Sequence, residues 1–172
     1  MLLNLTNVLT TEGCIEEKEV NYEKDVFACQ LGEFSIAVKT PVSLKLSNIG
    51  QEKALVEGTC TIKLQMQCDR CLTDLEHTFE IAFSHDVVPA MESSEEVSDE
   101  TEFMEGYNLD VDTLIDNEIL LNWPMKILCK DDCKGICKVC GKNLNDGSCS
   151  CDDFVPDPRM ASIMDIFNQS LK

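Results

Sequence analysis

Residues 54–68 read ALVEGTCTIKLQMQC and place an apolar or small residue at every even position. The same alternation runs through the even positions from Phe34 to Leu46, and it moves to the odd positions from Leu75 to Val87. A period of two over such lengths predicts half-buried antiparallel strands. We therefore expect two long hairpins, which turn near Asn48–Gly50 and at Asp69–Arg70.

Shorter signals extend this expectation on both sides. Residues 2–8 and 15–22 are candidates for further strands, and Pro41 predicts that the first long strand is an edge strand or bends there. After residue 108 the period becomes helical, with Asp110 or Asp112 as the cap and Pro124 as the stop. The apolar stripe of this helix consists of Val111, Leu114, Ile115 and Ile119. Another short helix is expected after Pro158.

These patterns predict an α+β fold: an antiparallel sheet of long hairpins, arranged either as an open meander or as a barrel-like sheet, with one or two helices and a C-terminal zinc knuckle. The expected division is an antiparallel β domain over residues 1–90, an acidic linker or loop over 91–108, and a helix plus cysteine-rich region over 109–172 that packs back on the sheet. The linker is acidic because residues 92–105 hold seven acids and few apolar residues.

Charge and length limit the function classes. The chain has 172 residues and a net charge of −18, from 14 basic and 32 acidic residues. Such a field repels a phosphate backbone, which argues against tight, sequence-independent binding to nucleic acid. No run approaches the roughly 20 apolar residues of a membrane helix, and the first residues lack the basic start of a secretory signal. We therefore expect a cytoplasmic protein.

Eleven cysteines are the largest departure from average composition. In a reducing compartment clustered thiols usually bind metal rather than form disulfides. Residues 129–151 read CKDDCKGICKVCGKNLNDGSCSC, and within them Cys137 and Cys140, followed by Gly141, have the form of a zinc knuckle. The glycine permits the positive φ that such a turn often needs. After a turn expected at Asn145–Gly147, the pair Cys149 and Cys151 can return to complete a site of four thiolates.

A second Cys-x-x-Cys pair, Cys68 and Cys71, lies at the expected tip of the second hairpin. Cys129 and Cys133 are the natural partners for it, which gives two zinc sites. Alternatively, Cys68 and Cys71 join the C-terminal cysteines in one shared site. We favour a single zinc site and keep two zinc sites as the other option. All-thiolate zinc sites are closed and therefore structural.

Enzymatic alternatives have weaker support. The spacing of Cys133, Cys137 and Cys140 matches a radical-SAM motif, but only 32 residues follow Cys140, too few for the barrel of those enzymes. A redox pair at Cys68 and Cys71 needs a helix after it, whereas an alternating strand follows. His77 and His85 are in phase with an apolar strand face and are expected to be packed. No catalytic residue is predicted.

Four lysines recur through the cysteine-rich segment: Lys130, Lys134, Lys138 and Lys142. Together with Lys126 they make the only basic stretch of the chain. They either compensate the charge of a zinc–thiolate centre or form a small patch that contacts RNA phosphates, with strong salt dependence.

Several of these motifs together resemble the YceD family of large ribosomal RNA subunit accumulation proteins. The resemblance lies in CDRCL at 68–72, DNEILLNWP at 116–124, the cysteine segment, and FVPDPRMASI at 154–163, and it covers roughly residues 30–172. It implies a non-enzymatic role in the accumulation or processing of 23S ribosomal RNA and in large-subunit assembly. The implied partner is a ribosomal RNA precursor or a pre-large-subunit particle.

Two other functions stay open from the sequence. One is an adaptor or holding protein for a basic ribosomal protein, without RNA contact, which the acidity of the chain favours. The other is a Cys-x-x-Cys thiol–disulfide oxidoreductase.

Overall fold

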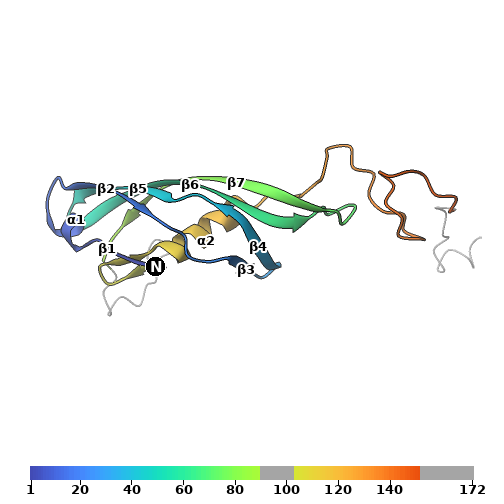
Figure 1. The fold of residues 1–172 in the computed structure, drawn as a ribbon. Helices are drawn as coiled ribbons and strands as arrows, with labels where there is room; N and C mark the ends of the chain where they lie inside the picture. The colour runs from blue at the N-terminus through green and yellow to red at the C-terminus, as the bar shows by residue number, and fades with distance from the viewer. Residues whose placement is uncertain (90–102, 152–172) are drawn as a thin grey trace, which may run out of the picture. The chain divides into compact units, whose positions relative to one another are not determined.

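The computed structural model describes residues 1–89 and 103–151 (Figure 1). The chain divides into two compact units. Unit 1 consists of Met1–Gln67 and Asp74–Ile127, and unit 2 of Cys68–Thr73 and Leu128–Lys172, described as far as Cys151. The short segment of unit 2 between Gln67 and Asp74 is the tip of a hairpin whose two strands belong to unit 1.

Unit 1 is built on a six-stranded antiparallel sheet (Figure 1). Its strands are β2 (Ile15–Val20), β3 (Val26–Cys29), β4 (Gly32–Lys39), β5 (Val42–Gly50), β6 (Lys53–Gln67) and β7 (Asp74–Val87). β7 pairs with the whole of β6, while β5 and β4 share the opposite edge of β6. β2 then pairs with β5, and β3 with β4. The expected antiparallel sheet of long hairpins is confirmed.

The sheet is open. Within the described residues β7 pairs only with β6, and β2 pairs only with β5, so these strands lie at opposite edges. The barrel-like closure that the sequence left open is therefore not formed.

A break at Thr40–Pro41 separates β4 from β5. The register against β6 shifts between Ile36 and Val38, and the backbone N–H of Thr40 still donates to the Thr61 carbonyl at 3.0 Å. Pro41 follows, and it has no N–H to contribute to the ladder. The bend expected at this proline thus divides one long alternating segment into two strands.

The hairpin turns lie close to the expected positions. The β5–β6 ladder continues to Gly50↔Lys53, so the turn is formed by Gln51 and Glu52, both with φ of 56°. Two positive φ values in a two-residue turn match the right-handed twist of the flanking strands. The β6–β7 ladder ends at Gln67↔Asp74, and the predicted turn residues Asp69 and Arg70 lie inside this tip.

The core of unit 1 lies on one face of the sheet. Even-numbered side chains of β6 are buried, and Val56, Ile62 and Leu64 are fully enclosed. α2 (Val111–Leu121) covers this face (Figure 1) and buries the predicted stripe. Its N-cap is Asp110, whose side chain accepts a hydrogen bond from the Asp112 N–H at 3.2 Å. The expected helix and its cap are thus confirmed.

The helix ends before Pro124, at Leu121, with Asn122 as the C-cap. The next residue, Trp123, lies among aromatic rings of the sheet. Its ring centroid is 5.1 Å from that of Phe34 and 5.7 Å from that of Phe79. This contact anchors the end of the helix on the sheet.

Four small elements complete unit 1: β1 (Leu2–Asn4), α1 (Thr6–Thr10), β8 (Met104–Glu105) and β9 (Asn108–Asp110). β9 pairs with both β1 and β8. The strand expected over residues 2–8 is wrong beyond Asn4, because a helix follows. Leu5, Val8 and Leu9 have i, i+3, i+4 spacing and are all buried, so helical burial overrides the alternating pattern.

Two expectations lie wholly or partly outside the described residues. One is the short helix after Pro158. The other is the acidic linker over 91–108, of which residues 91–102 are not described, while Phe103 and Met104 are each 5% exposed. No helix in the described part of the chain is long and apolar enough to cross a membrane.

Candidate metal centre

Eight cysteines of unit 2 gather in two groups of four. The first cluster comprises Cys68, Cys71, Cys129 and Cys133, and the second cluster comprises Cys137, Cys140, Cys149 and Cys151. Within each group the four sulfur atoms lie within 4.8 Å of one another, so each group can hold a metal ion. The sulfurs divide as in the two-site alternative, with the hairpin pair placed beside Cys129 and Cys133.

The first knuckle is formed at the tip between β6 and β7. The N–H of Cys68 donates to the Thr73 carbonyl at 2.9 Å, and the N–H of Leu72 donates back to the Cys68 carbonyl at 2.9 Å. Leu72 has a φ of 58°, in the left-handed region. This tight reversal of the backbone brings the sulfurs of Cys68 and Cys71 to the same side.

The second knuckle repeats this geometry. The N–H of Cys137 donates to the Lys142 carbonyl at 2.8 Å, and the N–H of Gly141 donates to the Cys137 carbonyl at 2.9 Å. Gly141 has a φ of 72°, as the knuckle motif predicted. The two knuckles share this backbone hydrogen-bond pattern but have different residues at the left-handed position. The left-handed backbone conformation costs a leucine about 1–2 kcal/mol of conformational energy, whereas a glycine has no such cost.

The sulfur separations in the first cluster suit a tetrahedral site. The Sγ atoms of Cys68 and Cys133 are 3.8 Å apart, and those of Cys71 and Cys129 are 3.5 Å apart. Zn–S bonds of about 2.3 Å in a tetrahedron place neighbouring sulfurs about 3.8 Å apart. These two separations are close to those of a four-thiolate zinc site, and all four sulfurs lie within 4.8 Å of one another.

Hydrogen bonds distribute charge unevenly within the first cluster. Burial alone would raise the pKa of Cys68, but the backbone N–H groups of Cys129, Arg70 and Cys71 outweigh it and lower the pKa to about 6. The hydrogen bond from Cys129 to Cys71 raises the pKa of Cys129 to about 12. Some sulfurs are thus prepared as thiolates, while others keep their protons until a cation replaces them.

The second cluster shows the same division. Backbone N–H groups of Cys140 and Val139 lower the pKa of Cys137 to about 7, and the Val139 nitrogen lies 3.4 Å from its sulfur. The hydrogen bond between Cys151 and Cys140 raises the pKa of Cys151 to about 12. A divalent cation would offset half of the charge of four thiolates in either cluster.

Two polar residues that support the first cluster were not predicted as site residues. Asn145 donates from Nδ2 to the sulfur of Cys133 at 3.3 Å and accepts from the Lys134 N–H at 2.9 Å. This amide is the main cause of the lowered pKa of Cys133. The Thr73 hydroxyl lies 3.2 Å from the sulfur of Cys71. The sequence suggested only a turn at Asn145, and nothing in the spacing connected either residue to a sulfur.

The link between the clusters is short and well fitted. Residues 134–136 join Cys133 to Cys137, and Gly135 among them has a φ of 77°. A side chain at Gly135 would place its Cβ 3.0 Å from the Arg70 carbonyl oxygen. The Leu144 N–H donates to the Gly135 carbonyl at 2.8 Å, so the link also contacts the loop that carries Asn145.

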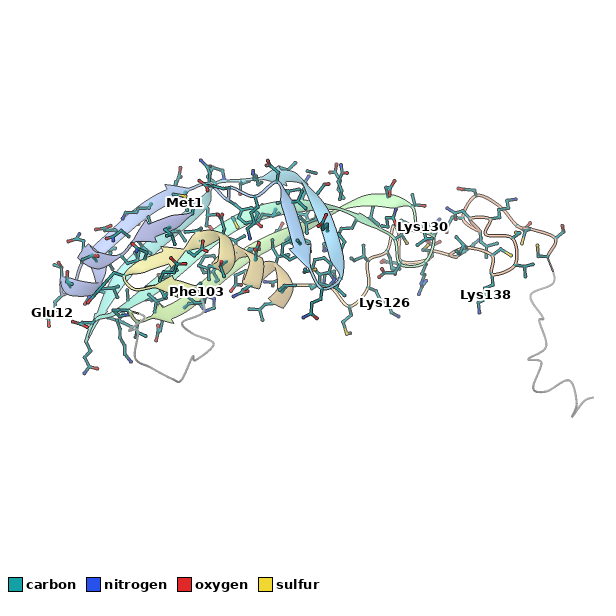
Figure 2. All side chains as sticks on the ribbon, turned by 90° about the horizontal axis from the view of Figure 1, so that it is seen from below. Met1, Glu12, Phe103, Lys126, Lys130 and Lys138 are labelled. Carbon is teal, nitrogen blue, oxygen red and sulfur yellow. The ribbon has the colours of Figure 1, made fainter. Side chains whose placement is uncertain are left out.

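The four predicted RNA-contact lysines are all exposed on unit 2. Lys130 lies 3.9 Å from Asp132, and Lys142 donates to the Ser148 carbonyl at 2.9 Å. Figure 2 shows Lys130 and Lys138 in the segment that carries the cysteines. Lys126, which the sequence placed in the same basic stretch, belongs to unit 1.

The histidines are packed within unit 1, as expected. His85 Nε2 lies 2.6 Å from the carboxylate of Glu118, and the ring of His77 meets Phe79 edge-on at 4.9 Å. The three isolated cysteines, Cys14, Cys29 and Cys60, are free thiols outside both clusters.

Comparison with protein families gives one match. Residues 56–167, more than half of the chain, match the family described as "Large ribosomal RNA subunit accumulation protein YceD". The match begins within β6 and extends past both clusters. No curated protein and no solved structure matches the chain significantly.

Proposed function

The chain belongs to the YceD family, and from this premise we propose that it is a non-enzymatic, cytoplasmic ribosome-biogenesis factor. Its role would be to support the accumulation or processing of 23S ribosomal RNA and the assembly of the large subunit. The family match carries this proposal, because the family description names ribosomal RNA accumulation and no chemical reaction.

We further propose that unit 2 holds two structural zinc ions, one in each cluster. Among the described residues of unit 2 the buried side chains are Cys68, Cys71, Cys133 and Cys137. A segment without a buried apolar core needs another source of stability, and all-thiolate zinc supplies it. The gathering of four sulfurs around the hairpin pair also favours a metal over a redox dithiol.

Lys130, Lys134, Lys138 and Lys142 are the proposed RNA contacts. The described residues of unit 2 carry five basic and four acidic side chains, whereas the whole chain has a net charge of −18. Unit 2 is therefore the part of the described chain least repelled by phosphate. Because two zinc–thiolate centres would add negative charge, the contact would be weak and strongly salt-dependent.

A second candidate is an adaptor for a basic ribosomal protein. The observation that favours it is the one-sided charge from Arg70 to Lys126, an interval with fifteen acidic residues and no lysine or arginine between its ends. Such a concentration of negative charge along the chain attracts a basic protein and repels RNA.

The test begins with metal analysis of anaerobically purified protein. Two zinc ions per chain are expected, while none would contradict the structural role. Co-sedimentation with large-subunit precursors, before and after nuclease, then separates the two candidates. A complex that needs intact RNA supports the biogenesis factor in contact with RNA, whereas a nuclease-resistant complex with one ribosomal protein supports the adaptor.

The RNA contact has its own matched variants. Replacing Lys134 and Lys138 by glutamine should weaken RNA binding and reduce its salt slope by about 1 for each lost phosphate contact. The same change at Lys45 and Lys53 of the sheet alters net charge equally and should leave the slope unchanged. Equal loss in both double variants would refute a specific contact by unit 2.

A further inference from the structure

The two edges of the sheet differ in how they are protected from other strands. Natural edge strands are usually short, interrupted, or marked by lysine or proline. β2 and β3 follow this rule, since they have six and four residues and β2 contains Lys18. β7 differs: it has 14 residues, continuous register with β6, no proline, lysine or arginine, and charged side chains that are all acidic. Within the described residues its outer edge pairs with no strand.

A groove runs beside the end of this edge. Its volume is about 770 Å³, and it is lined by Ser84 and Asp86 of β7, by Phe103, and by one side of α2. Apolar side chains of the helix are exposed there, with Leu120 at 45% and Leu121 at 75%. Exposed leucines beside an unpaired strand edge are typical of a surface that binds another chain.

The accessible charge of the groove is acidic. Asp86 is exposed there, whereas the Glu118 side chain is 6% exposed and its carboxylate lies 2.6 Å from His85 Nε2. No lysine or arginine lines it. A cationic segment would therefore find complementary charge, while RNA would be repelled.

We propose that the outer edge of β7 binds an extended, basic segment of a partner protein by strand addition. The backbone of the segment pairs with β7. A lysine or arginine side chain of the segment approaches the exposed Asp86, and its alternate apolar side chains contact Leu120 and Leu121. This inference rests on the adaptor candidate for the partner's identity and names the surface that would bind it; it requires neither the metal nor the RNA contact.

A synthetic peptide tests the surface directly. The probe is a fluorescent peptide of about ten residues, a common strand length, with alternating lysine and valine. Saturable binding to the full metal-loaded chain is expected by anisotropy, together with slower hydrogen exchange of β7 amides and unchanged exchange in β2. A peptide with glutamate in place of lysine should not bind. Protection spread equally over β2 and β7, or no protection of β7, would overturn the proposal.

Charge reversal separates the groove from general acidity. Asp86→Lys should weaken peptide binding by about tenfold, whereas Glu12→Lys should change it by less than about twofold. Both positions are exposed, and Figure 2 shows Glu12 well apart from Phe103 at the groove. Leu121→Ser should also weaken binding, because it removes apolar contact without burying a polar group. Circular dichroism melts check that each variant is folded.

The remaining outcomes distinguish this inference from the proposed function. Equal weakening by Asp86→Lys and Glu12→Lys would mean non-specific attraction and would refute strand addition. Displacement of the peptide by poly-uridine would show a nucleic-acid surface instead. If the peptide binds as expected while no ribosomal precursor co-sediments, the ribosomal function fails alone. If wild type and Asp86→Lys co-sediment equally and neither binds the peptide, the inference fails alone.

Discussion

In unit 1 the fully buried side chains are aliphatic and aromatic, whereas in the described part of unit 2 the buried side chains are cysteines. The apolar interior of unit 1 is stabilised by the apolar surface area that folding removes from water, and no reagent can extract that contribution. The cysteine interior of unit 2, with the proposed zinc ions bound, would depend on ions that a chelator can remove. The two units should therefore respond to different perturbations, and the two knuckles allow a finer comparison within unit 2.

Metal removal should have the largest effect. A chelator should unfold residues 129–151, because metal binding supplies about 10–16 kcal/mol in small zinc peptides. Hydrogen exchange should become fast throughout this segment and stay slow in the central residues of β6. Cys140→Ser should act in the same way on the second cluster. Slow hydrogen exchange at residues 129–151 after metal removal would show that metal does not stabilise unit 2, and the contrast between the two units would be wrong.

A cavity in the apolar core should destabilise unit 1 and leave the metal of unit 2 in place. Ile62 is fully buried in the core of unit 1. Ile62→Ala should lower the free energy of unfolding of unit 1 by about 2–5 kcal/mol. The number of metal ions per folded chain should not change. Loss of metal from this variant at temperatures where it is still folded would mean that the units are not independently stabilised.

Asn145 allows the support of one cluster to be removed. Asn145→Asp replaces the amide that donates to the Cys133 sulfur with a carboxylate that repels it. Loss of such a supporting hydrogen bond typically lowers metal affinity by about 10–100-fold. Competition with a coloured chelator should therefore show one weakened and one unchanged site. Asp146→Asn, at the neighbouring exposed position, is the control and should leave both sites unchanged.

The smallest effect should come from exchanging the left-handed residues of the two knuckles. Gly141→Ala introduces strain at a φ of 72° and should destabilise the second cluster by about 1 kcal/mol. Leu72→Gly should relieve strain at the first cluster, since its side chain is 58% exposed and contributes little burial. Melting of the metal-loaded protein and chelator competition measure both shifts. Gly141→Ala should lower and Leu72→Gly should raise the stability of its own cluster. Changes in the same direction would mean that the two knuckles are not equivalent.

The long elements were predictable because their signals are long. Alternation over β6 and β7 and the stripe of α2 indicated both the element and its buried face. β3 has only four residues and α1 only five, too few for a period to be distinguished. The strand expected over residues 2–8 is formed only as far as Asn4, because helical burial of Leu5, Val8 and Leu9 overrides it from there on.

The candidate site was predictable in its ligands and less so in its grouping. The pattern Cys-x-x-Cys indicated both knuckles, and Gly141 indicated the left-handed turn. Spacing alone could not decide whether Cys68 joins Cys133 or the C-terminal cysteines, because that depends on the path of the chain through space. The same holds for Asn145, whose contact with a sulfur arises only when two loops meet.

The short link between the clusters has a consequence for how metal is loaded. Residues 134–136 alone separate the last ligand of one cluster from the first ligand of the other. Once an ion fixes Cys133, Cys137 is confined to a small volume, and the entropy that the second ion must overcome falls accordingly. Half-filled chains should then be scarce, and the protein should pass from empty to doubly filled over a narrow range of free ion concentration.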